Sequence, residues 1–243
     1  MIVPRVIAHR GSSAAHPDNS WAAFHAAVAE GADIIECDVQ STRDGKLVIR
    51  HDLALQDRLV CDLASSTLEA AEPGTIDFGD FLDWAEGRTI GLLVEVKDPD
   101  AMQAVAMRVS ASPAHRRIVV GSFHAPALAA VKATLPAVQT SLMIGSVMAA
   151  DEIAGVATAY RVDGVHLCWE ARAPRPHRLL HSSVVERLRR SGLTITLWHE
   201  EREEELRALV ALDPDAICTN TPALLRRIVD APHARRAVPG AVR

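Results

Sequence analysis

Short apolar runs with the composition of β-strands alternate with longer amphipathic stretches along almost the whole chain. Parallel strands that are buried on both faces have this nearly continuous apolar character. Between them, apolar residues recur at helical spacing, as in the segment 19–30. Eight strands are therefore expected. They span residues 5–9, 34–39, 90–97, 118–123, 140–145, 163–168, 194–199 and 215–219.

Helices are expected between these strands. They lie near residues 19–30, 77–86, 100–111, 125–134, 149–158, 182–191, 201–212 and 221–230. Alternation with short connections implies parallel strands joined by right-handed crossovers. Eight uninterrupted repeats favour closure into an α/β fold of the (β/α)8 TIM-barrel type, and an open doubly wound sheet is the competing architecture. The length of 243 residues fits one such barrel. We expect a single domain over 1–230, with a short insertion after the second strand, and a loose tail over 231–243.

Charge and composition narrow the classes of partner. A formal net charge of −5 argues against binding to nucleic acid or attraction to anionic membranes, since both need clustered Lys and Arg. No apolar run is long enough to span a membrane, and the N-terminal residues show no signal-peptide pattern, so a cytoplasmic location is expected. A zinc site built from thiolates is not expected, because no two cysteines form a CxxC pair. The oligomeric state is left open.

The second strand carries two carboxylates at alternating positions. Glu36 and Asp38 lie on one face of the strand, whereas Cys37 lies on the other. Two carboxylates inside a barrel repel each other and are costly to bury, so they need a cation. Oxygen ligands select a hard divalent ion such as Mg²⁺ or Ca²⁺. The alternative interpretation is a structural cluster of salt bridges with Arg10 or Lys97.

The third strand ends in Glu95-Val96-Lys97. By the same alternation, Glu95 and Lys97 share one face. The third strand neighbours the second in a barrel of this order, so Glu95 is placed as a third oxygen ligand and Lys97 could steady a phosphate. Three converging carboxylates favour the metal site over the salt-bridge cluster.

Two histidines are expected at the mouth of the barrel, where TIM-barrel active sites lie. His9 ends the first strand beside Arg10, whose planar guanidinium suits a phosphate. The Asp44-Gly45 pair predicts a hairpin that returns His51 to the mouth. Two imidazoles on either side of a phosphate could act as general acid and general base.

These residues form part of an ordered series. The series runs His9-Arg10-Gly11, Pro17-Asp18-Asn19-Ser20, 31–39, Thr42-Arg43-Asp44-Gly45, Val48 and His51-Asp52, and continues with Glu95-Val96-Lys97, Ser122-Phe123, Trp198 and Thr219-Asn220-Thr221-Pro222. It resembles the signature of the glycerophosphodiester phosphodiesterase family. The resemblance implies a TIM barrel that hydrolyses glycerophosphodiesters, which are small-molecule phosphodiesters, to glycerol 3-phosphate and an alcohol.

The resemblance also implies roles for individual residues. A divalent metal ion would be bound by Glu36, Asp38 and Glu95, and His9 and His51 would be the acid–base pair. In such families a neighbouring hydroxyl of the substrate can attack first and give a cyclic phosphate, which water then opens.

Substrate contacts are implied as well. They would come from Arg10 and Lys97 on the phosphate, and from Phe123 and Trp198 in the pocket wall. A core position is the alternative for the two aromatic residues. His166, on the sixth strand, is expected to be a satisfied structural residue, and His199 is expected to be a loop or surface residue.

Two departures from the family pattern affect specificity. The family usually has Pro-Glu-Asn-Thr where this chain has Pro17-Asp18-Asn19-Ser20. The segment 53–74 is shorter than the insertion that covers the site and helps to bind glycerol in many relatives. A phospholipase-D-like barrel acting on a lysolipid and a catalytically silent barrel binding a phosphorylated metabolite are therefore kept as alternatives. No motif in the sequence supports a further alternative, a metal-dependent sugar isomerase on the same fold.

Overall fold

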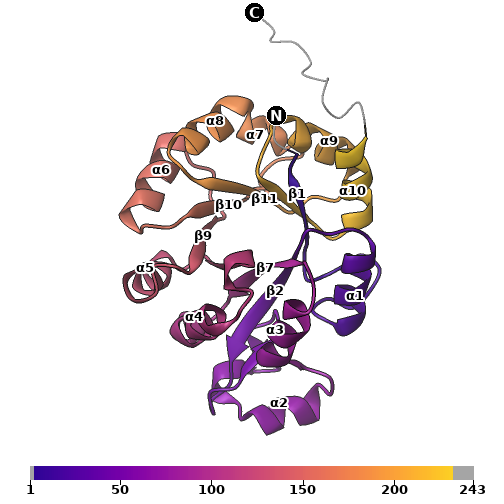
Figure 1. The fold of residues 1–243 in the computed structure, drawn as a ribbon, viewed down its shortest axis with the longest axis vertical. Helices are drawn as coiled ribbons and strands as arrows, with labels where there is room; N and C mark the ends of the chain where they lie inside the picture. Colours follow the sequence, from indigo (N-terminus) through magenta and orange to yellow (C-terminus); the bar gives the residue numbers. More distant parts are fainter. Residues whose placement is uncertain (1–2, 232–243) are drawn as a thin grey trace, which may run out of the picture.

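Eight parallel strands close into a barrel in the computed structural model, which describes residues 3–231 (Figure 1). The barrel strands are β1 (Arg5–Ala8), β2 (Ile34–Ser41), β7 (Gly91–Val96), β8 (Ile118–Ser122), β9 (Gln139–Ile144), β10 (Gly164–Cys168), β11 (Thr194–Trp198) and β12 (Ala216–Thr219). Strand β1 pairs with β2 on one side and with β12 on the other, which closes the ring. The predicted TIM barrel is confirmed, and the open sheet is excluded.

Helices form an outer ring around the strands (Figure 1). The main helices are α1 (Trp21–Ala29), α3 (Phe78–Glu86), α4 (Met102–Ala111), α5 (Ala125–Thr134), α6 (Ala150–Ala159), α8 (Ser182–Arg190), α9 (Glu203–Ala211) and α10 (Pro222–Asp230). All eight were predicted. The short helix α7 (His177–Leu180) and the 3₁₀ turns η1 (Val60–Asp62), η2 (Pro99–Ala101) and η3 (His115–Arg117) were not.

The insertion after β2 is a small substructure at the barrel rim. The Asp44-Gly45 turn joins β2 to the antiparallel strand β3 (Leu47–Ile49), as predicted. The rest of the insertion was not predicted. It comprises β4 (Ala54–Leu55), β5 (Arg58–Leu59), α2 (Ser65–Ala71) and β6 (Ile76–Asp77). Leu68 of α2 packs against Val48 and Val60 in a core of its own.

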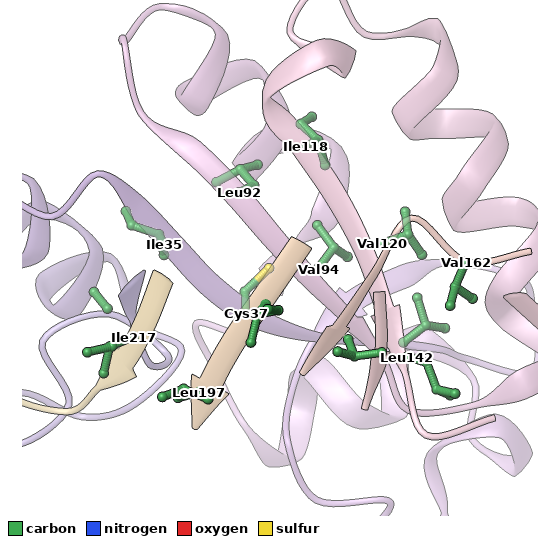
Figure 2. Packing of buried hydrophobic residues seen from close by; sticks show 14 of the residues in the cluster. Ile35, Cys37, Leu92, Val94, Ile118, Val120, Leu142, Val162, Leu197 and Ile217 are labelled. Carbon is green, nitrogen blue, oxygen red and sulfur yellow. The ribbon is translucent and has the colours of Figure 1, made fainter. Parts of the chain in front are cut away.

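Alternation along the strands separates two groups of core residues. Ile35 and Cys37 of β2 and Val94 of β7 belong to the large cluster between the barrel and its helices (Figure 2). Ile7 and Ile34, among others, fill the barrel interior. Side chains two residues apart share a face, so Glu36 and Asp38 point inward from β2.

Among residues 3–231, no helix has the length and apolar character needed to cross a membrane. The cytoplasmic location stays a prediction. Of the predicted tail, residues 232–243 lie outside the described part of the chain.

Candidate active site

Three inward carboxylates meet at the mouth of the barrel. Asp38 of β2 is in register with Glu95 of β7, and Glu36 lies two residues before Asp38 on the same face. The three residues each offer one oxygen, and these oxygens lie within 4.8 Å of one another. All three side chains are buried. Glu36 Oε1 and Glu95 Oε2 have no hydrogen-bond partner among the described residues.

The charges in this acidic triad are only partly balanced. Lys97 Nζ lies 2.6 Å from Glu95 Oε1 and 3.1 Å from Asp38 Oδ1, and Arg10 Nε lies 3.1 Å from Asp38 Oδ2. Both predicted salt-bridge partners are therefore present, but they supply two positive charges against three carboxylates. Within residues 3–231, the one hydrogen bond that Glu36 accepts comes from the backbone N–H of Arg10, at 2.8 Å.

This imbalance shows in the pKa values. Burial, followed by the charges of Asp38 and Glu95, raises the pKa of Glu36 well above its usual range. Burial and the charge of Asp38 also raise the pKa of Glu95, although Lys97 opposes this shift. A divalent cation would relieve both effects, and an oxygen-only ligand set suits a hard ion. The triad therefore fits a divalent metal ion.

The turn after β1 brings Arg10 to the triad. Arg10 and Gly11 both have left-handed backbone conformations, with φ of 55° and 86°. A Cβ on Gly11 would lie 2.6 Å from the backbone carbon of Ala23, so only glycine fits there. The side chain of Asn19 donates to Asp38 Oδ2 at 2.8 Å, and Asp18 accepts from Arg10 Nη1 at 3.0 Å. The Pro17–Ser20 motif thus positions the triad and its arginine.

His9 is buried beside the triad in a defined orientation. Its Nδ1 lies 2.6 Å from Asn220 Oδ1, and the Nδ2 group of Asn220 donates to Glu201. The amide oxygen therefore faces the ring, so Nδ1 carries the proton and Nε2 has the lone pair. His9 Nε2 lies 3.9 Å from Glu36 Oε2. Burial, followed by the charge of Arg10, lowers the pKa of His9 well below its usual value.

His51 lies on the opposite, insertion side of the mouth. It follows β3 directly, and its Nδ1 lies 2.8 Å from Asp52 Oδ1. The side chain is 37% exposed, and its charge is close enough to affect the pKa of Glu95. The hairpin thus returns His51 to the mouth of the barrel, and its role in the reaction stays a prediction.

Aromatic rings line the mouth on the β8–β11 side. The ring of Trp198 meets His9 edge-on at 5.3 Å between centroids, and Phe123 lies 6.0 Å from Trp198. Phe123 is 50% exposed, so it is not a core residue. The indole nitrogen of Trp198 has no partner in the described part of the chain.

Two further histidines lie near the mouth. His199 is in the loop after β11, as expected, and it stacks on His9 with centroids 4.7 Å apart, a contact that was not predicted. His166 is fully buried beneath Trp198, and neither ring nitrogen has a partner within residues 3–231. Burial lowers the pKa of His166 to about 3. It is therefore neutral, but it is not the satisfied residue that was predicted.

The class so defined is that of (β/α)8 barrels with a buried triad of carboxylates at the mouth. The model of the glycerophosphoryl diester phosphodiesterase family matches residues 9–72. This segment contains both predicted acid–base histidines, His9 and His51, and two of the three triad carboxylates, Glu36 and Asp38. The resemblance to the glycerophosphodiester phosphodiesterase family seen in the sequence is thus confirmed.

Individual relatives show the same resemblance. "Probable glycerophosphodiester phosphodiesterase 1" of Mycobacterium tuberculosis is 30% identical over 177 residues, which cover 58% of this chain and 64% of that protein. The glycerophosphodiester phosphodiesterase of Caldanaerobacter subterraneus is 26% identical, with 92% of this chain and 97% of that protein covered.

Solved structures share the fold. A glycerophosphodiester phosphodiesterase from Parabacteroides distasonis has a TM-score of 0.80 at 21% identity, with 94% of this chain and 97% of that chain covered. An Oleispira antarctica phosphodiesterase, solved with the product sn-glycerol-3-phosphate, has the same TM-score, identity and coverage.

Proposed function

We propose that this protein hydrolyses glycerophosphodiesters to glycerol 3-phosphate and an alcohol, with the help of a divalent cation. The observation that carries the proposal is the buried triad of Glu36, Asp38 and Glu95, with a histidine on each side of it. The names of the relatives and the product bound to the Oleispira phosphodiesterase support the same reaction.

Mg²⁺ or Ca²⁺ would be held by the three carboxylates. When bound, such an ion supplies positive charge that polarises phosphate oxygens and orients the substrate. The unpartnered oxygens of Glu36 and Glu95 support this role, because a buried ionised carboxylate needs a partner.

The phosphate is bound by Arg10 and Lys97. Both side chains reach the triad, and Asp38 contacts both. Each can donate charge-assisted hydrogen bonds to phosphate oxygens, and the guanidinium of Arg10 can do so with two N–H groups at once. Phe123 and Trp198 cover the apolar part of the substrate.

His9 and His51 act as the acid–base pair. The hydrogen bond to Asn220 leaves the lone pair on His9 Nε2, and this nitrogen faces the triad. This geometry supports proton transfer by His9 at the phosphate, and Asp52 orients His51. One of the two imidazoles takes the proton of the substrate's neighbouring hydroxyl as that hydroxyl attacks phosphorus, and the other gives a proton to the oxygen of the departing alcohol. Water then opens the resulting cyclic phosphate to give glycerol 3-phosphate.

The test is release of glycerol 3-phosphate from a panel of glycerophosphodiesters, first in EDTA and then with Mg²⁺, Ca²⁺ or Mn²⁺ restored. Release that depends on a cation is expected. The absence of release with every ion, from protein shown to be folded, would contradict the proposal.

A lysolipid phosphodiester is the second candidate substrate, and one observation favours it. Several large apolar side chains of the insertion and of loops at the mouth end of the barrel are about half exposed, namely Leu53, Leu59, Phe123 and Val147. These loops could contact an acyl chain. Including a lysophospholipid in the same panel separates the two candidates, because its cleavage releases a lysophosphatidic acid instead of glycerol 3-phosphate.

A further inference from the structure

A second recess opens at the mouth, next to the reacting groups. It is a hollow of about 630 Å³ between the loop after β10 and the loop after β11. His199 forms part of its wall and stacks on His9 at 4.7 Å. The hollow therefore continues from the site on the His9 side, whereas His51 and the insertion lie on the other side.

Most charged groups around this hollow are already paired. Arg202 binds Glu200 with Nη2 at 2.6 Å from Oε2, and Glu201 accepts from Asn220. These groups hold the loop after β11 in place. They are not available to a ligand unless these contacts break.

Glu170 and Arg172 are different. Glu170 Oε2 is buried and has no hydrogen-bond partner among the described residues. Arg172 uses Nε to donate to the carbonyl oxygen of Gly145 at 2.7 Å, and no carboxylate of residues 3–231 forms an ion pair with its guanidinium. The two side chains line the same hollow without pairing with each other.

We propose that this hollow binds the alcohol portion of the substrate and selects an alcohol that carries both an ammonium and a carboxylate group. The inference rests on the proposed function. An ammonium group can donate to Glu170, and a carboxylate can accept two N–H groups from Arg172. One ligand with both charges satisfies both side chains, whereas a singly charged alcohol leaves one of them unpaired.

The bonds of Arg172 make it suited to this task. Its hydrogen bond to Gly145 leaves the two terminal nitrogens of the guanidinium for a ligand. Phe123 and Arg172 both lie beside Gly145. A Cβ atom placed on this glycine would be 3.7 Å from the ring of Phe123 and 3.6 Å from Nη2 of Arg172. The carbon chain of the alcohol can therefore lie against an aromatic edge while its charged groups reach the two side chains.

The experiment compares kcat/KM for three substrates that differ only in the alcohol. Glycerophosphoserine carries both charges, glycerophosphoethanolamine carries the ammonium alone, and glycerophosphoglycerol carries neither. We expect the wild-type protein to prefer the serine compound over each of the others by about tenfold or more, as expected for one charged hydrogen bond.

Two variants divide this preference into its parts. Arg172→Gln should reduce the preference for serine over ethanolamine about tenfold, because it removes the partner of the carboxylate. Glu170→Gln should reduce the preference for ethanolamine over glycerol by a similar factor. Arg175→Gln and Glu204→Gln are the matched controls, because both residues are exposed charges outside the hollow, and they should leave every ratio unchanged.

The outcomes separate this inference from the function on which it rests. If all three substrates are cleaved at equal efficiency, or if the two variants change all three equally, the subsite is wrong while the hydrolase function stands. If no substrate releases glycerol 3-phosphate with any cation, the proposed function fails and the subsite fails with it.

Discussion

Replacing Glu36 with glutamine tests two effects of the acidic triad, namely the loss of folding stability from its charge repulsion and the gain in stability when a cation binds. The amide has nearly the same size, and its oxygen can still accept the backbone N–H of Arg10, which now lies 2.8 Å from the carboxylate. The replacement removes the triad charge that has no side-chain cation within hydrogen-bond distance, since Lys97 and Arg10 contact the other two carboxylates. Without a metal ion, we therefore expect Glu36→Gln to stabilise the protein.

The size of the effect follows from the geometry. The oxygens of the triad lie within 4.8 Å of one another, and two unit charges at that limit repel by about 3.5 kcal/mol at an effective dielectric constant of about 20. Glu36 faces two such charges, and attraction to Arg10 and Lys97 offsets a large part of the repulsion. We expect a net gain of about 2 kcal/mol in the free energy of unfolding, which corresponds to a Tm about 4–8 °C higher for a chain of this size.

The pH dependence has a definite sign. The pKa of Glu36 is raised in the folded state, so the folded protein binds more protons than the unfolded chain above the ordinary glutamate range. Stability in EDTA should thus fall as the pH rises through that range toward the raised pKa. The fall should be smaller in Glu36→Gln, and the comparison is best made at about pH 8, where more of Glu36 is ionised.

The assay is denaturant and thermal unfolding with EDTA or with added Mg²⁺ or Ca²⁺. At about 100 times its Kd, a cation should stabilise the wild-type protein by about 2.7 kcal/mol. Glu36→Gln should gain much less, so the order of stability reverses when the cation is added. A variant that is less stable than wild type in EDTA, yet gains as much from the cation, would refute the reasoning. Glu204→Gln, an exposed control, should follow wild type in both conditions.

Three further results are expected. His9→Ala and His51→Ala should each lower kcat at least about a hundredfold, the usual acid–base contribution, with unchanged far-UV circular dichroism; near-normal turnover in either would remove that residue from the reaction. Lys97→Met should raise KM for any glycerophosphodiester more than tenfold in steady-state kinetics, since a charged phosphate contact is lost. Gly11→Ala should cost about 3 kcal/mol or more in urea unfolding, because of its positive φ and the contact with Ala23, whereas Gly45→Ala, with φ of 81° and open space around it, should cost about 1 kcal/mol.

The strands and main helices could be predicted because each carries its own periodic signal. A strand buried on both faces, such as β7 (Gly91–Val96), is apolar except where a functional side chain points inward. Glu36, Asp38 and Glu95 are such interruptions, and strand alternation alone places them on one face. The parallel register of β2 and β7 then brings Asp38 beside Glu95.

The remaining features depend on contacts between segments far apart in the chain. Asn220 orients His9 across 211 residues, and only the closure of β12 against β1 brings the two together. His199 has the sequence context of a surface residue, and its stacking on His9 follows from the turn after β11. The short helix α2 is stabilised by a small separate core around Leu68, and so few residues give no readable periodicity.

The contacts of Asp38 with Arg10 and Lys97 link the binding of the cation to the binding of the substrate. In the protein alone, both basic side chains share Asp38. An ion that takes over this carboxylate weakens its hold on both side chains and frees them for a phosphate. Coupling of this kind is reciprocal, so a bound phosphate must tighten the cation by the same factor. The protein would then bind its ligands in a preferred order, with the ion preparing the two basic groups before the diester arrives, and phosphate or glycerol 3-phosphate should lower the cation's measured Kd.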